Sequence, residues 1–275
     1  MALIKFKESI SSDPNGILLS WNTSTHFCNW YGITCHPTLP RVTQLNLQGH
    51  KRTFELANNS FYGNIPLEVG RLSQLQKFNV ENNTLVGEIP LNLTHCTQLK
   101  TLYLYGNNLR GKIPTKIGLL RNIQFLNFSQ NHLTGEIPSS IGNLSSITHL
   151  FLTHNNLEGD IPQEICHLKS LMIVTFGINK LKAIENQLSG CLPPNMFHTL
   201  QNLQVLELSV NRFSGPIPPS IPNASTLLLL ALSYNHFVGR IPSLGKLHDL
   251  HLSKNNLGYN STNDFGVFKI IGKLY

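Results

Sequence analysis

The sequence predicts an α/β fold: a right-handed solenoid of 24-residue coils, with a parallel β-sheet on the concave face and short helices or 3-10 turns on the convex side. Leu and Asn are in excess, with 45 Leu and 30 Asn among 275 residues, which indicates a requirement repeated along the chain. The tetrad Gly-x-Ile-Pro recurs at 24-residue steps from Gly63 to Gly159. The pattern Leu-x-x-Leu-x-Leu-x-x-Asn precedes the tetrads, and self-similarity at a fixed period is the signature of a repeat architecture.

Each repeat is expected to begin with one short strand. In residues 99–107, Leu102 and Leu104 alternate with Tyr103 and Tyr105, which predicts that the leucines point inward and the tyrosines outward. Parallel strands joined by returning segments of about 18 residues stack at roughly 4.8 Å. The leucines of successive coils therefore form one continuous core, and the Ile-Gly-x-Leu part of each return is expected to form a short helix.

An Asn follows each predicted strand. Its amide can both donate and accept, so we expect it to bond backbone groups of neighbouring coils that would otherwise be buried without partners. The Gly of the tetrad allows a sharp turn, and Pro is tolerated where no ladder donor is needed. The predicted structural ladder consists of Asn59, Asn83, Asn107, Asn131, Asn155, Asn179, Asn211 and Asn235.

Residues 109–120 and 133–144 both read Leu-x-Gly-x-Ile-Pro-x-x-Ile-Gly-x-Leu, a segment that resembles the plant-specific leucine-rich repeat. Residues 2–14, the Leu-Ser-Trp-Asn of 19–22 and the Cys-Asn-Trp-Tyr-Gly-Ile-Thr-Cys of 28–35 resemble the N-terminal cap of plant leucine-rich-repeat receptor-like kinase ectodomains. We therefore divide the chain into a helical cap, residues 1–40, and a solenoid of about nine to ten full or partial repeats, residues 41–275. The kinase domain of that family is absent from this chain.

A cap is also required on physical grounds, because the first coil of a solenoid would otherwise expose its leucine stack. Trp21 and Trp30 are expected to supply apolar area against a first strand at residues 42–47. Cys28 and Cys35 are interpreted as a disulfide, which implies an oxidising compartment. A zinc site with the neighbouring histidines is the alternative, but six intervening residues are poor spacing for zinc. The remaining cysteines, to which we assign no bridge, are Cys96, Cys166 and Cys191.

The period breaks at two places. His50 stands where the first ladder Asn is expected and Asn59 follows nine residues later, while Asn186 follows Asn179 by only seven. Such short segments cannot close a full coil at about 3.3 Å per residue. We therefore predict shortened coils near residues 51–53 and 182–185.

Composition argues against several classes of protein. The formal charge is +7 and the pI about 9.2, but the 21 Lys and Arg residues are dispersed, which disfavours a nucleic-acid interface. The longest purely apolar run has six residues, at 227–232, far fewer than the roughly 18–20 that span a bilayer. The first residues do not show the pattern of a signal peptide. Sequons, which are typical of a secreted glycoprotein, occur at Asn22, Asn58, Asn82, Asn92, Asn127, Asn143, Asn223 and Asn260.

No catalytic pattern emerges from the sequence. It contains no His-Glu-x-x-His, nucleophile elbow or P-loop. The Asp-Phe-Gly of residues 264–266 lacks the other protein-kinase motifs and is interpreted as coincidence. We predict no catalytic residue, no metal and no cofactor.

The outward positions of adjacent strands are rich in aromatic side chains, which the leucine stack does not need. Exposed aromatics among polar neighbours are typical binding anchors, although incidental surface aromatics are the alternative interpretation. The predicted ligand-binding residues of the concave face are Lys77, Tyr103, Tyr105, Phe125, Asn127, His149 and Phe151.

The resemblance implies a function in recognition. It predicts a non-catalytic, extracellular module at the outer face of the plasma membrane that binds a peptide or protein ligand, with a leucine-rich-repeat co-receptor as a further partner. Two alternatives stay open at this point: a secreted inhibitor resembling polygalacturonase-inhibiting proteins, and a truncated, non-functional receptor fragment.

Overall fold

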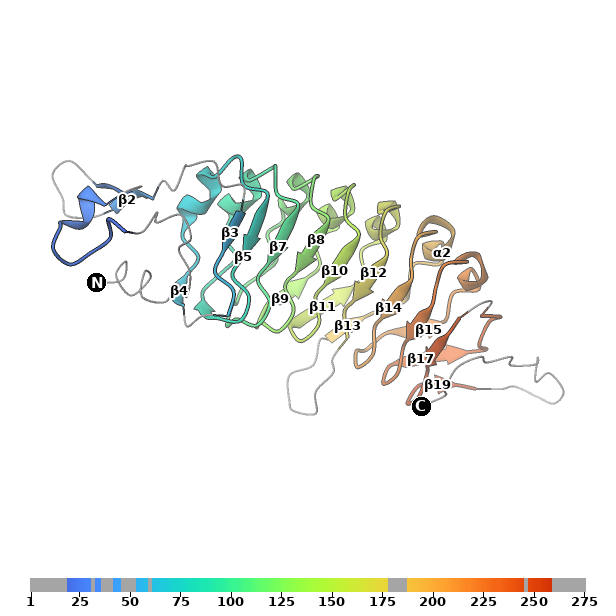
Figure 1. The fold of residues 1–275 in the computed structure, drawn as a ribbon. Helices are drawn as coiled ribbons and strands as arrows, with labels where there is room; N and C mark the ends of the chain where they lie inside the picture. The colour runs from blue at the N-terminus through green and yellow to red at the C-terminus, as the bar shows by residue number, and fades with distance from the viewer. Residues whose placement is uncertain are drawn as a thin grey trace.

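The computed structural model describes residues 19–30, 33–35, 42–45, 53–58, 61–177, 187–244 and 247–258, and the described chain forms a row of coils (Figure 1). Each coil gives one strand to a nine-stranded parallel sheet. Its strands are β3 (Thr53–Glu55), β5 (Lys77–Asn79), β7 (Thr101–Tyr103), β8 (Phe125–Asn127), β10 (His149–Phe151), β12 (Ile173–Thr175), β14 (Val205–Glu207), β16 (Leu229–Ala231) and β18 (Asp249–His251). The predicted solenoid with a parallel sheet is confirmed.

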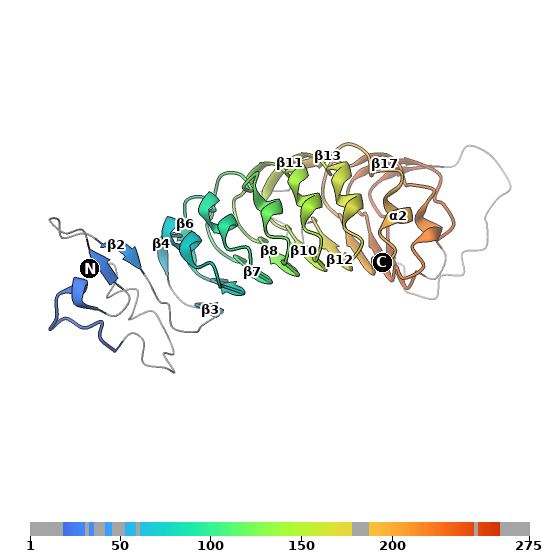
Figure 2. The ribbon, with the colours of Figure 1, turned by 90° about the horizontal axis from the view of Figure 1, so that it is seen from above.

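The rest of most coils forms a strand of a second layer and then a short helix. The second-layer strands are β4 (Tyr62–Asn64), β6 (Thr84–Val86), β9 (Thr134–Glu136), β11 (Asn156–Asp160), β13 (Gln187–Ser189), β15 (Ser214–Pro216), β17 (His236–Gly239) and β19 (Asn256–Leu257). The helices are η2 (Leu67–Arg71), η3 (Leu91–His95), η4 (Ile117–Leu119), η5 (Ser139–Asn143), η6 (Gln163–His167), α2 (Met196–Thr199) and η7 (Ile221–Asn223), and all but α2 are 3-10 helices. The row of coils curves, and the nine-stranded sheet lies on its inner side (Figure 2).

The core is a stack of aliphatic side chains between these layers. The middle residue of each central strand is fully buried, as Leu102, Leu126, Leu150 and Leu206 show. Burying one such side chain stabilises the fold by about 1.5–3 kcal/mol. Because each leucine packs against those of the neighbouring coils, no coil could retain this contribution alone.

The ladder amides join one coil to the next. Asn131 donates from Nδ2 to the carbonyl oxygens of Leu104 (2.9 Å) and Phe128 (3.1 Å), and its Oδ1 accepts from the backbone N–H of Leu109 at 3.0 Å. The same set of bonds is made by Asn83, Asn107, Asn155, Asn235 and Asn255. Asn59 and Asn179 lie outside the described residues.

The expected first solenoid strand at residues 42–47 is wrong. β2 (Val42–Leu45) pairs antiparallel with β1 (Ile33–Cys35), and within the described residues it belongs to a separate two-stranded sheet. The nine-stranded sheet begins with β3, in register with β5 one 24-residue step later. Seven residues separate β2 from β3, and a parallel crossover needs a dozen or more, so β2 and β3 cannot be parallel neighbours.

The described part of the cap contains a stacked tryptophan pair. Trp21 and Trp30 are buried, with ring centroids 5.5 Å apart and planes inclined by 19°. The Nε1–H of Trp30 donates to Thr25 Oγ1 at 3.1 Å, and the 3-10 helix η1 (Phe27–Asn29) precedes Trp30. Cys28 within η1 is disulfide-bonded. The side chain of Cys35, its predicted partner, lies outside the described part of the chain.

The three other cysteines are free thiols. Cys96 and Cys166 are buried on the helical side of the coils, and Cys191 is exposed. Burial raises the pKa of Cys96 to about 11, which is opposed in part by a hydrogen bond with Leu72. These buried thiols stay protonated at neutral pH.

The predicted shortened coils near residues 51–53 and 182–185 fall largely outside the described residues, but the strands that flank the second break are placed. β12 pairs directly with β14, with Ile173 opposite Val205, 32 residues later. The coil that joins them is therefore longer than 24 residues, not shortened. Its extra residues enter where the chain leaves the large sheet, between Gly177 and Gln187.

Candidate functional site

The candidate site is the outward side of the nine-stranded sheet, which we call the sheet face. In β7, β8 and β10 the middle residue is buried, and the first and third residues are half-buried on the opposite side. The predicted ligand-binding residues all occupy such outward positions, or the outward position two residues beyond a strand. They are Lys77 in β5, Tyr103 in β7, Tyr105 beyond it, Phe125 and Asn127 in β8, and His149 and Phe151 in β10.

The structure brings three of these residues together as an aromatic cluster. His149 stacks on Phe125, with centroids 4.4 Å apart and planes at 24°, and its ring lies 6.0 Å from that of Phe151. The His149 Nδ1 lies 2.8 Å from Thr148 Oγ1. Burial lowers the pKa of His149. The imidazole is therefore uncharged at neutral pH, and the cluster presents an apolar surface.

The cluster continues into a longer row of side chains, which we call the apolar stripe. Phe125, His149, Ile173, Val205 and Leu229 are the first residues of five consecutive strands and lie opposite one another in register. All five are half-buried. Four strand spacings of about 4.8 Å give the stripe a length of roughly 19 Å. Its outer side is covered by no described element of the chain.

Sequence reasoning missed Ile173, Val205 and Leu229. Each stands directly before the second leucine-type residue of its strand pattern, as Phe125 and His149 do. Reading that position coil by coil would have found all three, because residues 203–211 and 227–235 keep the Leu-x-x-Leu-x-Leu-x-x-Asn pattern around Val205 and Leu229.

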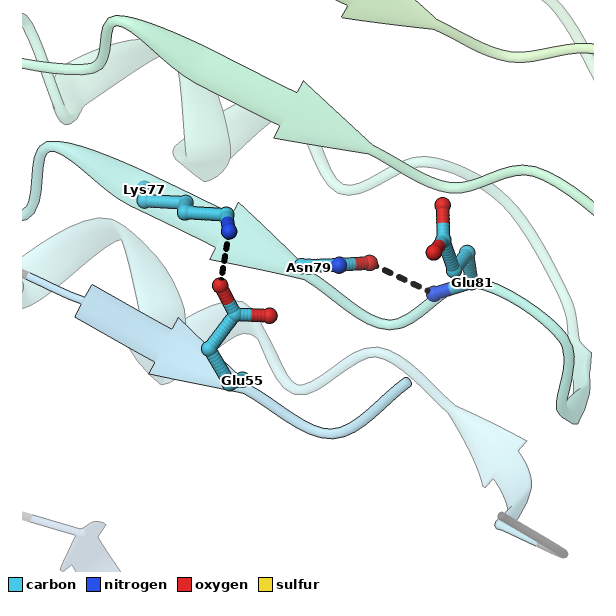
Figure 3. Close-up of polar contacts among 4 residues, drawn as sticks. All are labelled: Glu55, Lys77, Asn79 and Glu81. Carbon is cyan, nitrogen blue, oxygen red and sulfur yellow. Dashed lines mark hydrogen bonds and ion pairs between the residues drawn. The ribbon is translucent and has the colours of Figure 1, made fainter. Parts of the chain in front are cut away.

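Beyond Tyr103, towards the N-terminus, the sheet face becomes polar (Figure 3). Lys77 forms an ion pair with Glu55 on the neighbouring strand. Asn79 is buried, and its Oδ1 accepts from the backbone N–H of Glu81 at 3.0 Å. The carboxylate of Glu81 makes no ion pair with any described residue.

Tyr103 lies between this polar end and the aromatic cluster. Burial raises the pKa of its hydroxyl, and the charges of Glu81 and Glu55 raise it further, while that of Lys77 opposes them. Tyr103 is therefore a neutral hydrogen-bonding group that lies within electrostatic reach of the three charged side chains. It pairs in register with Asn79 on one side and Asn127 on the other.

Glu207 occupies an outward position of β14, and its hydrogen bonds are a feature that the sequence did not reveal. Its Oε2 accepts from the backbone N–H of Gly177 at 3.0 Å, and its Oε1 accepts from that of Ser209 at 2.9 Å. Burial raises the pKa of this carboxyl, which the hydrogen bonds lower in part. A side chain at residue 177 would collide with the backbone carbonyl of Ser209 as well as with the Glu207 carboxylate, so glycine is favoured there.

The site offers contact surface and hydrogen-bonding groups. Within the described ranges, no three His, Cys, Asp or Glu side chains gather in a way that could hold a metal ion. The helices of the same ranges include none that is long and apolar enough to cross a membrane. An extended row of half-buried apolar side chains with polar neighbours is suited to holding an extended ligand.

Two family models match the chain. Residues 1–36 match the model described as "Leucine rich repeat N-terminal domain". The model described as "Leucine Rich Repeat" matches residues 98–120, 122–144, 146–168 and 202–224. The matches to the repeat fall on coils that contribute β7, β8, β10 and β14 to the sheet.

Relatives from Arabidopsis thaliana match shorter stretches. The LRR receptor-like serine/threonine-protein kinase EFR is 42% identical over 91 residues, which are 27% of this chain and 9% of that protein. Protein MALE DISCOVERER 1 is 34% identical over 90 residues, 26% of this chain and 13% of that protein. The matched part of the chain thus spans only about a tenth of the length of these relatives.

Solved structures match most of the chain. The ectodomain of the Arabidopsis thaliana membrane receptor kinase GASSHO1/SCHENGEN3 is 33% identical with a TM-score of 0.70, over 93% of this chain and 32% of that one. The ectodomain of the Arabidopsis receptor kinase HAESA is 29% identical with a TM-score of 0.68, over 93% and 41%. A plant ice-binding protein is 25% identical with a TM-score of 0.56, over 95% and 97%.

Proposed function

The chain is a leucine-rich-repeat protein similar to plant receptor ectodomains, and on this premise we propose that it recognises an extended peptide, or an extended segment of a protein, on its sheet face. Recognition is non-catalytic: the ligand lies across the strands and contacts several coils at once. Small contacts from each coil add up along the ligand, which is how extended peptides are bound by sheet and groove surfaces.

The apolar stripe is the observation that carries this proposal. Five in-register side chains from Phe125 to Leu229 remain half-exposed although a fully buried core lies directly beneath them. Folding does not require apolar residues at these outward positions, since the outward positions of β3 and β5 are charged or polar. Contiguous exposed apolar surface of this kind is typical of interaction sites.

The solved structures support the same proposal. The GASSHO1/SCHENGEN3 ectodomain was solved in complex with CASPARIAN STRIP INTEGRITY FACTOR 2, and HAESA with the peptide hormone IDA and the co-receptor SERK1. By analogy we extend the proposal to a location at the outer face of the plasma membrane and to a leucine-rich-repeat co-receptor. This chain covers 32% and 49% of those two chains, so these extensions concern the part of a receptor that it represents.

The test uses a displayed library of random 14-residue peptides selected against the folded chain. We expect the wild type to enrich binders. The variants Phe151→Ala and Ile173→Ser should weaken those binders by at least about tenfold, because each removes apolar contact near the centre of the surface. The matched control is Leu119→Ala, an exposed apolar side chain in η4 on the helical side.

Circular dichroism and thermal unfolding of each variant show whether the fold is kept. Binders that lose affinity for the two sheet-face variants but not for Leu119→Ala support the proposal. A library that enriches nothing, or binders that respond equally to all three variants, would contradict it.

A further inference from the structure

The charges of the sheet face have the opposite sign to those of the whole chain. The chain carries a formal charge of +7. The outward positions of the large sheet carry four carboxylates, on Glu55, Glu81, Glu207 and Asp249, and one ammonium, on Lys77. The other described Lys and Arg residues are all exposed and lie outside these positions: Arg71, Lys100, Arg110, Lys112, Lys116, Arg121, Lys169, Arg212, Arg240 and Lys254.

From this segregation we propose that the ligand of the sheet face is a basic peptide segment, with a Lys or Arg side chain held against Glu81 and an apolar run laid over the stripe. The inference rests on the proposed function and specifies the ligand's chemistry. A cationic ligand is attracted to the sheet face and repelled by the remaining surface. The electrostatic field of the chain therefore also orients the ligand as it approaches.

Glu81 and Asp249 are the two sheet-face carboxylates that neither an ion pair nor a backbone N–H group holds within the described residues, and of these only Glu81 has an aromatic side chain in the same position on the next coil. Glu55 is already neutralised by Lys77, and Glu207 is held by two backbone N–H groups. Glu81 makes no ion pair within the described residues, and its charge acts on Tyr103. Tyr105 occupies on the next coil the position that Glu81 has on its own. A guanidinium or ammonium there would meet both a carboxylate and an aromatic ring, an arrangement that favours cations.

The spacing of these features sets the spacing expected in the ligand. Glu81 lies two strands away from Phe125 across the sheet and four residues away in the direction of the strands, a separation of roughly 16 Å. An extended ligand would need about five residues to cover this distance. The stripe itself, about 19 Å long, would take about six residues. The ligand is therefore a segment of about a dozen residues with its basic residue near one end and its apolar run near the other.

The library selection tests this inference with a second set of variants. We expect peptides enriched by the wild type to carry Lys or Arg about five positions from an apolar run. Their affinity should fall about three- to tenfold in Glu81→Gln and fall again as salt rises from 50 to 300 mM. Glu136→Gln is the matched control, since Glu136 is an exposed glutamate of β9, in the second layer. Replacing the peptide's basic residue by Glu should abolish binding to the wild type.

The possible outcomes distinguish a failure of the basic-ligand inference from a failure of the proposed function. Binders that are neutral or acidic, or that respond alike to Glu81→Gln and Glu136→Gln, overturn the basic ligand and leave the sheet face as a peptide site. A selection without binders, or binders indifferent to Phe151→Ala and Ile173→Ser, overturns the proposed function and the present inference with it.

Discussion

The coils before and after residues 178–186 pair their strands in one common register. They differ in the length of the segment that leads from one strand of the large sheet to the next. From β5 to β12 each strand follows the last by 24 residues, whereas the later steps are 32, 24 and 20. All of these strands nevertheless pair in one sheet, while the second-layer strands fall into three short sheets. The strand and its buried leucine therefore fix the position of a coil, and the return absorbs changes in length.

The difference affects the ladder amide of Asn211, which follows the long coil between β12 and β14. Asn211 donates to Phe176 O at 3.2 Å and to Leu208 O at 3.1 Å, but its buried Oδ1 has no hydrogen-bond partner among the described residues. In the regular coils the same atom accepts a backbone N–H from the preceding coil, as in Asn107 and Asn131. The extra residues of the long coil thus leave the sheet intact but weaken the hydrogen bonding of the ladder amide that follows them.

The largest predicted effect is the difference in stability between variants that lack the ladder amide of Asn131 and of Asn211. Asn131→Ala leaves the Leu109 N–H unpaired and removes one of the two amide donors from the carbonyls of Leu104 and Phe128. It should lower the free energy of unfolding by about 3–5 kcal/mol, at about 1–3 kcal/mol for the buried unpaired N–H and about 1 kcal/mol for each of the two lost amide bonds. Asn211→Ala should cost only about 1–2 kcal/mol, because it removes fewer bonds and one unpaired acceptor. Urea unfolding of both variants measures the difference.

Equal losses in the two variants would show that the rung after the long coil is as well formed as the others. Asn107→Ala serves as a second regular rung and should match Asn131→Ala, since its bonds have the same pattern.

A smaller effect is expected at the residue before each rung, which has a left-handed backbone. Its φ is 53° at Gln130 and 55° at His154, and 59° at Val210. A β-branched residue is strained there, whereas Asn tolerates the conformation. Val210→Asn should therefore stabilise the chain by about 1 kcal/mol, and Gln130→Asn should change stability by less than about 0.5 kcal/mol. Thermal unfolding compares them, and a destabilised Val210→Asn would argue against strain at this turn.

The smallest effect concerns Glu207, which bridges from β14 to the start of the long coil. Its pKa is raised in the folded chain, so the fold favours the protonated carboxyl. The stability that Glu207 contributes is present below its unfolded pKa and is lost as pH rises through the raised pKa. As pH rises above about 4, the unfolding free energy of the wild type should fall relative to that of Glu207→Gln. A flat or rising difference would mean that the two N–H bonds outweigh burial.

Much of the fold could be predicted from the sequence because the period itself encodes the packing. Leucine alternation locates the buried residues, and the amide four residues before each glycine locates the rung. The extra residues between Asn179 and Asn186 could not be interpreted in this way, since either Asn satisfies the pattern and only strand pairing decides between a lost coil and a long one. The cap strand β2 was misassigned because it shares the Leu-x-Leu alternation of the solenoid strands.

The candidate site was predicted in part for the same reason. Tyr103, Phe125, His149 and Phe151 lie in coils with an unbroken period, so their outward positions could be counted. Val205 and Leu229 occupy the same position of the leucine pattern in later coils and could have been counted in the same way. The charge contrast at Glu55, Glu81 and Glu207 depends on which side of the sheet each residue occupies, which composition does not report.

The central claim is that one continuous recognition surface crosses the long coil. A peptide from the selection that carries a photoreactive benzoylphenylalanine in its apolar run, irradiated on the folded chain, tests this most directly when the adducts are mapped by mass spectrometry. Scanning the label along the run should give adducts on both sides of the long coil, at β8 and β10 and at β14 and β16. Adducts confined to one side, or concentrated in the helices and second-layer strands, would contradict it.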